Sequence, residues 1–130
     1  MSQVQDKLIG SVPSRIVDVA QLLVTPYEGR VAEYNVATWL HLPGLANLPV
    51  SLMVSYRDGD KRREVSVDHG KVNAYGRILL SGIARMPVRQ KIEDMQVRLR
   101  SAVPPQSLVV EEFFVQAVEQ ANSESRQATA

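Results

Sequence analysis

Trp39, the only tryptophan of the chain, lies in a run whose spacing places polar side chains beside it. The run Tyr34–Leu42 alternates apolar and more polar residues with a period of two, which is typical of a β-strand. On such a strand Asn35 and His41 share a face with Trp39, and Tyr34 lies on the core side. A flat aromatic ring packs on the apolar face of a sugar ring, and planar polar groups bind its hydroxyls. The run therefore indicates a candidate binding face.

Four further residues could complete a cleft around Trp39. Tyr56 and Tyr75 are the candidate second aromatics, because both lie in neighbouring predicted strands. Arg98 and Arg100 would supply paired guanidinium donors if their strand belonged to the same sheet. The alternative is that Trp39 belongs to the core of the fold. Aromatic residues make up only 5% of the chain, which is few for a sugar-binding protein and favours this alternative.

The sequence shows no pattern typical of an enzyme or a metal site. His41 and His69 are its only histidines, they lack metal-ligand spacing, and there is no cysteine. Glu111 and Glu112 are neighbours on a predicted strand and would point to opposite faces, so they could not act across one bond. No Gly-x-Ser-x-Gly turn and no glycine-rich phosphate loop is present. We therefore expect no catalytic residue, no metal ion and no cofactor.

Length and composition are those of one globular domain. The chain has 130 residues, of which 45% are hydrophobic and 22% charged. No apolar run approaches the roughly 20 residues that span a bilayer, and the first residues lack the pattern of a secretory signal. We therefore expect no membrane partner, and a protein that is cytoplasmic or assembled into a viral particle.

Charge is distributed unevenly along the chain, although the formal net charge is +1. Residues 57–100 hold eleven Lys and Arg against six Asp and Glu, whereas residues 101–130 hold one against four. Solvated surfaces explain this pattern, and head-to-tail contact between copies is the alternative. The basic run Lys61-Arg62-Arg63 is either a solvated turn or a contact for phosphate or an anionic glycan. Nucleic acid is not an expected partner, because no motif for it is present and the net charge is near zero.

Period-two patterns and turn residues predict an all-β fold, a two-sheet antiparallel β-sandwich with an N-terminal arm. The expected parts are the arm at 1–26, the sandwich domain at 27–118 and a polar C-terminal tail at 119–130. Strands are predicted at 34–42, 50–56, 63–69, 75–83, 95–101 and 108–118, with a loop around Pro87 at 85–91.

Within these parts some assignments have alternatives. The β-branched residues of 16–24 favour a strand, although Ser14 could cap a helix there, and a short helix over 3–9 is a weaker alternative. On the strand 63–69, Val65, Val67 and His69 are expected to share one face. Phe113 and Phe114 would place one aromatic ring on each face of the last strand.

From Tyr34 onward the order of features resembles the jelly-roll carbohydrate-binding modules that are fused to xylanases and other glycoside hydrolases. Their first strand has the form Tyr-x-Val-Ser-Ala-Trp-Val-Arg-Leu, and Tyr34–Leu42 looks similar. An alternating strand ending in Asp58-Gly59, the segment from Tyr75 to Pro87, and an acidic strand at Val110–Glu112 follow in the same order. The N-terminal part of those modules has no counterpart in 1–26. Their calcium site lacks its partner acid here, so calcium is not expected.

The resemblance implies that the sandwich is of jelly-roll type and that the protein is a non-catalytic module that binds a glycan by stacking on Trp39. The alternative is a structural assembly subunit, such as a phage capsid-decoration or tail protein. The N-terminal arm and the uneven charge favour this alternative, with homo-oligomers formed through the arm. The expected partner is thus a glycan, or copies of this chain or other protein subunits. An exposed Trp39 beside polar groups would favour the glycan, and a buried Trp39 with a projecting arm would favour assembly.

Overall fold

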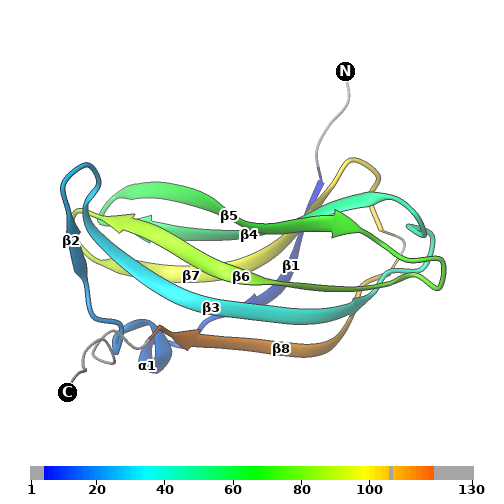
Figure 1. Ribbon diagram of the computed structural model, residues 1–130, viewed down its shortest axis with the longest axis horizontal. Helices are drawn as coiled ribbons and strands as arrows, with labels where there is room; N and C mark the ends of the chain where they lie inside the picture. The colour runs from blue at the N-terminus through cyan, green and yellow to red at the C-terminus, as the bar shows by residue number, and fades with distance from the viewer. Residues whose placement is uncertain (1–4, 106, 119–130) are drawn as a thin grey trace, which may run out of the picture.

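Two antiparallel β-sheets pack face to face in the computed structural model, which describes residues 5–105 and 107–118 (Figure 1). The elements in chain order are β1 (Gln5–Ser11), α1 (Ser14–Val17), β2 (Leu23–Thr25), β3 (Gly29–His41), β4 (Pro49–Asp58), β5 (Lys61–Lys71), β6 (Arg77–Val88), β7 (Ile92–Ser101) and β8 (Val109–Ala117). One sheet has the order β1-β7-β4-β5. In the other, β6 lies along one edge of β3, and β2 and β8 lie along its other edge. The predicted all-β sandwich is confirmed.

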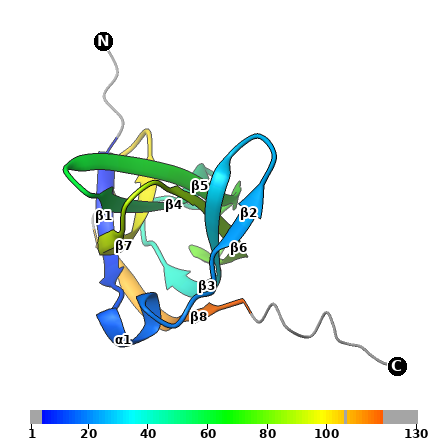
Figure 2. The ribbon, with the colours of Figure 1, turned by 90° about the vertical axis from the view of Figure 1, so that its left-hand side faces the viewer.

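The chain changes sheet at most of its connections. The hairpins β2–β3 and β4–β5 stay within one sheet, and the other connections between successive strands cross to the opposite sheet. This wrapped connectivity is that of a jelly roll. The turns β2–β3, β4–β5 and β6–β7 gather at one end of the sandwich, on the left in Figure 1 and facing the viewer in Figure 2.

Alternation along β3 decides which of its side chains enter the core. Tyr34, Val36 and Leu40 are buried, whereas Asn35 and Trp39 are exposed, as the period-two pattern predicts. The inward side chains meet those of β4, β6 and β7 in one hydrophobic core between the sheets. The outward side chains of β3 remain on the surface of a sheet whose central strand carries them.

Two buried tyrosines each bring a hydroxyl group into this core, and each hydroxyl is hydrogen-bonded to a backbone carbonyl oxygen. The hydroxyl of Tyr34 donates to the carbonyl oxygen of Val17 at 2.7 Å, and that of Tyr56 donates to Pro87 at the same distance. Burial raises the pKa of each phenol to about 12, so both hydroxyls keep their protons and donate. The hydrogen bonds tie α1 and β6 to the core.

The N-terminal residues are part of the sandwich, and the expected separate arm is wrong. β1 pairs with β7 from Gln5 opposite Ser101 to Ser11 opposite Gln96. The helix considered for 3–9 is therefore also wrong over the residues that the structure describes. The segment 16–24 is divided between the end of α1, a turn and the start of β2, so a single strand there is wrong as well. The expected tail at 119–130 lies outside the described residues.

Helix α1 has four residues and begins after Pro13, which occupies the N-cap position in an extended conformation. Ser14 forms the first turn and makes no side-chain cap hydrogen bond, so the cap considered for it is wrong, although the alternative of a helix here is correct for Ser14–Val17. Pro13 fits this place because a proline conformation leads into a helix and its missing N–H is not needed there. Val17 of α1 is buried and seats the helix on the core.

A β-bulge changes the face that β5 presents. Leu52 pairs with Asp68 and Met53 pairs with Ser66, so Val67 is an extra residue between them. As a result Val65 and Val67 pack against the core, whereas His69 is exposed. The expectation that all three share one face is wrong, because a bulge shifts the alternation by one residue.

Strand β6 continues through Pro87, where a loop was expected. Pro87 lies opposite Val31 of β3, and the strand ends one residue later, at Val88. A proline has no N–H to donate, and it is tolerated here because β6 pairs with β3 along only one edge in the described sheets.

Strands β5 and β6 close one edge of the sandwich without forming a ladder. The Oδ2 atom of Asp68 accepts a hydrogen bond from the backbone N–H of Ser81 at 2.9 Å. A Cβ atom at Gly82 would lie 2.7 Å from the carbonyl oxygen of Val67, so the close approach requires glycine.

Of the helices in the described ranges, none is long and apolar enough to cross a membrane.

Candidate binding site

Trp39 lies on the outer face of the sheet formed by β6, β3 and β8 and is 39% exposed. It is paired across the sheet with Leu79 of β6 and with Glu112 of β8. Because β3 is flanked on both sides at this point, the indole is held on a paired part of the sheet and not on a free edge. Thus Trp39 is not a core residue, and the ring presents part of its surface to solvent.

A hollow of about 370 Å³ adjoins the indole, and we call it the aromatic hollow. Its walls are Trp39, Arg77, Glu111 and Glu112. Arg77 begins β6, and its Nη2 atom lies 3.3 Å from the Oε2 atom of Glu111. The guanidinium is therefore oriented by a neighbouring carboxylate at the edge of the hollow.

A second β-bulge brings both glutamates to the same place. Trp39 pairs with Glu112 and the next residue, Leu40, pairs with Val110, which leaves Glu111 as the extra residue of β8. Both carboxylates therefore line the aromatic hollow, although neighbours on a regular strand would point apart. The expectation that Glu111 and Glu112 lie on opposite faces is wrong for this reason. Thr38 supports the bulge, because its hydroxyl donates to the carbonyl oxygen of Glu112 at 2.7 Å.

The aromatic hollow has the chemical groups that a sugar needs. An indole surface packs on the C–H face of a pyranose, and two carboxylates and a guanidinium offer acceptors and donors for its hydroxyl groups. Charged partners form shorter and stronger hydrogen bonds than neutral ones. The arrangement can therefore bind and orient a polyhydroxylated ring.

The structure brings some of the predicted site residues near this hollow. Asn35 and His41 lie on the outer face of β3 together with Trp39, and His41 is paired with Arg77. Tyr75 is 82% exposed in the turn before β6, and the backbone of Gly76 that follows it accepts a hydrogen bond from Leu42. Hence Tyr75 is at the same end of the sandwich as His41, beyond the aromatic hollow.

Three of the predicted site residues are not part of this face. Tyr56 is fully buried, with its hydroxyl bonded to the core side of β6, so it presents no ring to a ligand. Arg98 and Arg100 belong to β7 and point outward from the other sheet. Arg100 is also paired with Asp6 at 2.8 Å. Including these three residues in the site was wrong, because the strand β7 joins β4 and not β3.

Sequence reasoning missed Arg77 and the two glutamates as companions of Trp39. The register of β3 against β6 and β8 places them there, and these strands are distant in sequence. Local patterns predict a strand but not its partner or its register. The only available signal was the acidic pair Glu111-Glu112 in a predicted strand, and the bulge that turns both to one side has no signature in the sequence.

The face around the aromatic hollow also carries exposed apolar side chains, which we call the apolar stripe. These are Leu79 and Ile83 of β6 and Phe114 of β8, which are 46%, 51% and 51% exposed. Phe113, by contrast, packs against the core, so the expectation of one aromatic ring on each face of β8 is confirmed. Exposed apolar side chains that lie together on one face are a common mark of an interaction surface.

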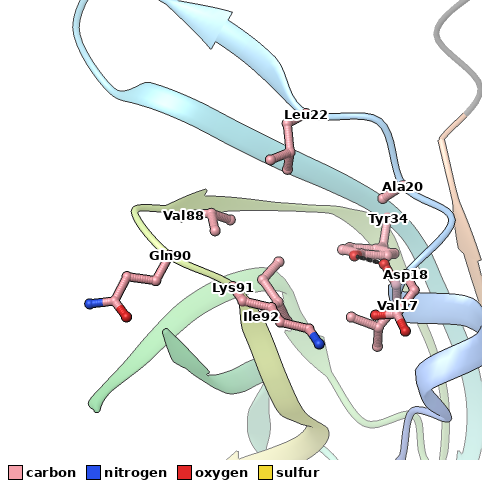
Figure 3. Close-up of a pocket in the computed structure, with 9 residues that line it drawn as sticks. All are labelled: Val17, Asp18, Ala20, Leu22, Tyr34, Val88, Gln90, Lys91 and Ile92. Atoms are coloured by element: carbon pink, nitrogen blue, oxygen red, sulfur yellow. Dashed lines mark hydrogen bonds between the residues drawn. The ribbon is translucent and has the colours of Figure 1, made fainter. Parts of the chain in front are cut away.

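Figure 3 shows a different hollow, of about 300 Å³, at the end of the sandwich where α1 meets the β6–β7 turn. Its walls combine apolar residues with Tyr34 and with three polar or charged ones; the lining residues are Val17, Asp18, Ala20, Leu22, Tyr34, Val88, Gln90, Lys91 and Ile92. The Tyr34 hydroxyl is already donated to Val17. Tyr34 is buried and presents no ring face to a ligand, so this pocket suits the stacking of a sugar ring less well than the aromatic hollow does.

No family model matches the chain. No curated protein matches it, and no solved structure does. Among the residues that the structure describes, no group of three or more His, Asp or Glu could hold a metal ion.

Proposed function

We propose that the protein is a non-catalytic β-sandwich binding module that recognises carbohydrate on the outer face of β6, β3 and β8. The observation that carries the proposal is the partly exposed Trp39, which shares one hollow with Arg77, Glu111 and Glu112. The indole stacks on the sugar ring and the charged groups bind its hydroxyls. The resemblance of Tyr34–Leu42 to the first strand of jelly-roll carbohydrate-binding modules supports the same conclusion.

The experiment is a screen of immobilised neutral glycans with the purified protein, repeated with Trp39→Ala. Binding to a defined class of glycan that Trp39→Ala lowers by roughly tenfold or more is expected, since an aromatic ring contributes most of the apolar contact. Tyr75→Ala is the matched control, because it removes an exposed aromatic ring outside the hollow. Absence of any glycan that discriminates wild type from Trp39→Ala would contradict the proposal.

A structural assembly role is the second candidate, and the apolar stripe favours it. Leu79, Ile83 and Phe114 are better suited to a protein partner than to a sugar, because they offer apolar area without polar groups. The two candidates use different residues of one face. If the face is a contact between copies, Ile83→Lys and Phe114→Lys lower the mass measured by light scattering, whereas Trp39→Ala alone lowers glycan binding. If the wild-type protein is monomeric at all concentrations, self-assembly through this face is excluded.

A further inference from the structure

The other end of the sandwich carries a groove of about 510 Å³ that differs from the aromatic hollow in charge. It lies where the β2–β3 hairpin, the β4–β5 hairpin and the β6–β7 turn meet, at the end that faces the viewer in Figure 2. Three arginines line it, and the residues that matter here are Tyr27, Arg30, Arg63 and Arg89 over a floor of Pro87 and Val88. We call it the arginine groove.

The buried carboxylate of Asp58 holds parts of the wall of the arginine groove in place by hydrogen bonds. Asp58 is 3% exposed and accepts hydrogen bonds from the Arg63 Nε–H at 3.0 Å and from the N–H groups of Arg89 and Gln90 at 2.8 Å. Burial alone would raise the pKa of Asp58, but these hydrogen bonds outweigh it and lower the pKa, so the carboxylate stays charged. Asp58 thereby fixes the β6–β7 turn and the Arg63 side chain through its Nε atom, and leaves the outer nitrogens of the guanidinium for a ligand.

Arg30 is fixed in the same way by the turn. Its Nη2 atom donates to the carbonyl oxygen of Arg89, which joins the start of β3 to the β6–β7 turn. The guanidinium groups of Arg30 and Arg63 are thus held by the protein before any ligand arrives, which lowers the entropy that binding would cost.

The positive charge of the arginine groove is only partly neutralised by the acids nearby. The one glutamate of its wall, Glu28, is paired with Arg85 at 2.8 Å, and Asp58 is engaged by Arg63. Neither Arg30 nor Arg89 forms an ion pair within residues 5–105 and 107–118. A second hollow beside the groove shares Arg63 and Arg89 and is also lined by Lys61, Asp58 and Asp60, so the charge along the β4–β5 hairpin is mixed.

An aromatic ring accompanies these cations. Tyr27, at the tip of the β2–β3 hairpin, is 98% exposed. A fully exposed tyrosine beside guanidinium groups offers a stacking surface and charged donors to one ligand. Since guanidinium groups bind carboxylate and sulfate in a bidentate manner, the ligand class that fits is an acidic saccharide.

We propose that the arginine groove is a second binding site, which takes a sugar bearing a carboxylate or a sulfate group. The acidic group binds between Arg30, Arg63 and Arg89, and the sugar ring lies against Tyr27. The site is independent of the aromatic hollow, because Gly29 and Trp39 are ten positions apart on β3, a separation of about 33 Å along the strand. Of the basic run Lys61-Arg62-Arg63, only Arg63 lines the groove, and Arg62 is paired with Asp94 instead.

The test is a titration of isotope-labelled protein with trigalacturonate, with a heparin-derived oligosaccharide and with neutral maltotriose, followed through backbone amide shifts. Shifts at Arg30, Arg89 and Gln90 are expected with an acidic saccharide and not with maltotriose. The uronate and sulfate probes show which acidic group the site takes, and binding of either one supports the proposal. If neither acidic saccharide shifts these amides, or if maltotriose shifts them equally, the proposal is wrong.

Variants separate the arginine groove from general charge. The double variant Arg30→Gln/Arg89→Gln should weaken binding of the acidic saccharide by roughly tenfold or more, because two charge-assisted contacts are lost. The control Arg57→Gln/Lys71→Gln removes the same charge from exposed residues outside the groove and should bind like wild type. Equal loss in both double variants would overturn the proposal. Trp39→Ala should leave this binding unchanged, so failure of the proposed neutral-glycan function would be seen separately.

Discussion

At the scale of single residues, position in the sheet decides what Trp39 can do. The same indole facing inward would be one more core side chain, but the alternation of β3 turns it outward beside three charged groups. The sequence predicted that Trp39, Asn35 and His41 share this face. It could not predict that Arg77 lies beside them, because the pairing of His41 with Arg77 depends on which strand becomes the neighbour of β3.

Arg77 provides the prediction that is most specific to the aromatic hollow. Arg77→Gln should weaken binding of the cognate oligosaccharide about tenfold and leave the unfolding midpoint nearly unchanged, since Arg77 is half exposed and its ion pair with Glu111 is screened by water. Calorimetric titration and thermal unfolding measure the two effects. Arg57→Gln is the control, because Arg57 is similarly exposed and paired with Glu93 on the opposite sheet. Equal affinities of wild type and Arg77→Gln for the oligosaccharide would show that Arg77 does not take part in binding.

Asp58 gives a prediction about stability and pH. Asp58→Asn should lower the free energy of unfolding by about 1–3 kcal/mol, because the amide cannot accept all three hydrogen bonds made by the buried carboxylate. The folded-state pKa of Asp58 is lowered below that of the unfolded chain, about 3.9. Its contribution is therefore complete above that pH and is lost as the pH falls through the lower folded-state pKa.

Urea unfolding at pH 7 and at successively lower pH measures this contribution. The difference between wild type and Asp58→Asn should be largest at pH 7 and should shrink in acid. A difference that stays constant down to the acid transition would show that Asp58 acts through something other than its charge.

At the scale of elements, the strands of the body were predictable and their irregularities were not. The alternation of 34–42, 50–56 and 95–101 led to β3, β4 and β7 with the expected inward faces. The bulges at Val67 and Glu111 escaped prediction, because a bulge is set by pairing with another strand and not by local propensity. One of these bulges builds the aromatic hollow, so the part of the fold that sequence patterns missed is also the part that positions the site.

The strand predicted for residues 16–24 was wrong for a different reason. β-branched residues over 16–24 favour a strand locally, but Pro13 starts a helical turn and Val17 anchors it on the core, where Tyr34 donates to its carbonyl oxygen. Packing against the body thus overrides local strand propensity. Sequence patterns without tertiary contacts cannot show this competition.

Gly82 tests the closed edge between β5 and β6. Gly82→Val should destabilise the fold by about 1–3 kcal/mol, because its Cβ would lie 2.7 Å from the carbonyl oxygen of Val67 and a backbone atom must move to admit it. Ser81→Val, an exposed neighbour on the same strand, should change stability by less than about 0.5 kcal/mol. Chemical unfolding of both variants compares them. Similar midpoints for the two variants would show that the edge can open without cost.

At the scale of the whole molecule, the uneven charge of the sequence is largely compensated inside one chain. Arg85 pairs with Glu28 and Glu33, and Arg77 pairs with Glu111, so basic residues of 57–100 meet acids from outside that segment. Asp6 of β1 likewise pairs with Arg100. The imbalance along the sequence therefore needs no second copy to explain it. In the arginine groove, Arg63 pairs with Asp58, whereas Arg30 and Arg89 form no ion pair with the residues that the structure describes.

The place of β1 gives the prediction for the whole fold. Deleting residues 1–11 should lower the unfolding midpoint strongly and promote aggregation, because it exposes the backbone edge of β7 along its pairing with β1. Thermal unfolding and light scattering measure the two effects. A truncated chain that is as stable and as dispersed as wild type would mean that β1 is a detachable arm after all.

The central claim, that the face at Trp39 binds sugar, is tested most directly by the fluorescence of Trp39 itself. Since the chain has one tryptophan and it is 39% exposed, its emission reports on the aromatic hollow alone. We predict that titration with the glycan found in the screen shifts and saturates this emission, with the same dissociation constant as calorimetry. Binding seen by calorimetry without any change in Trp39 emission would place the sugar elsewhere and contradict the account.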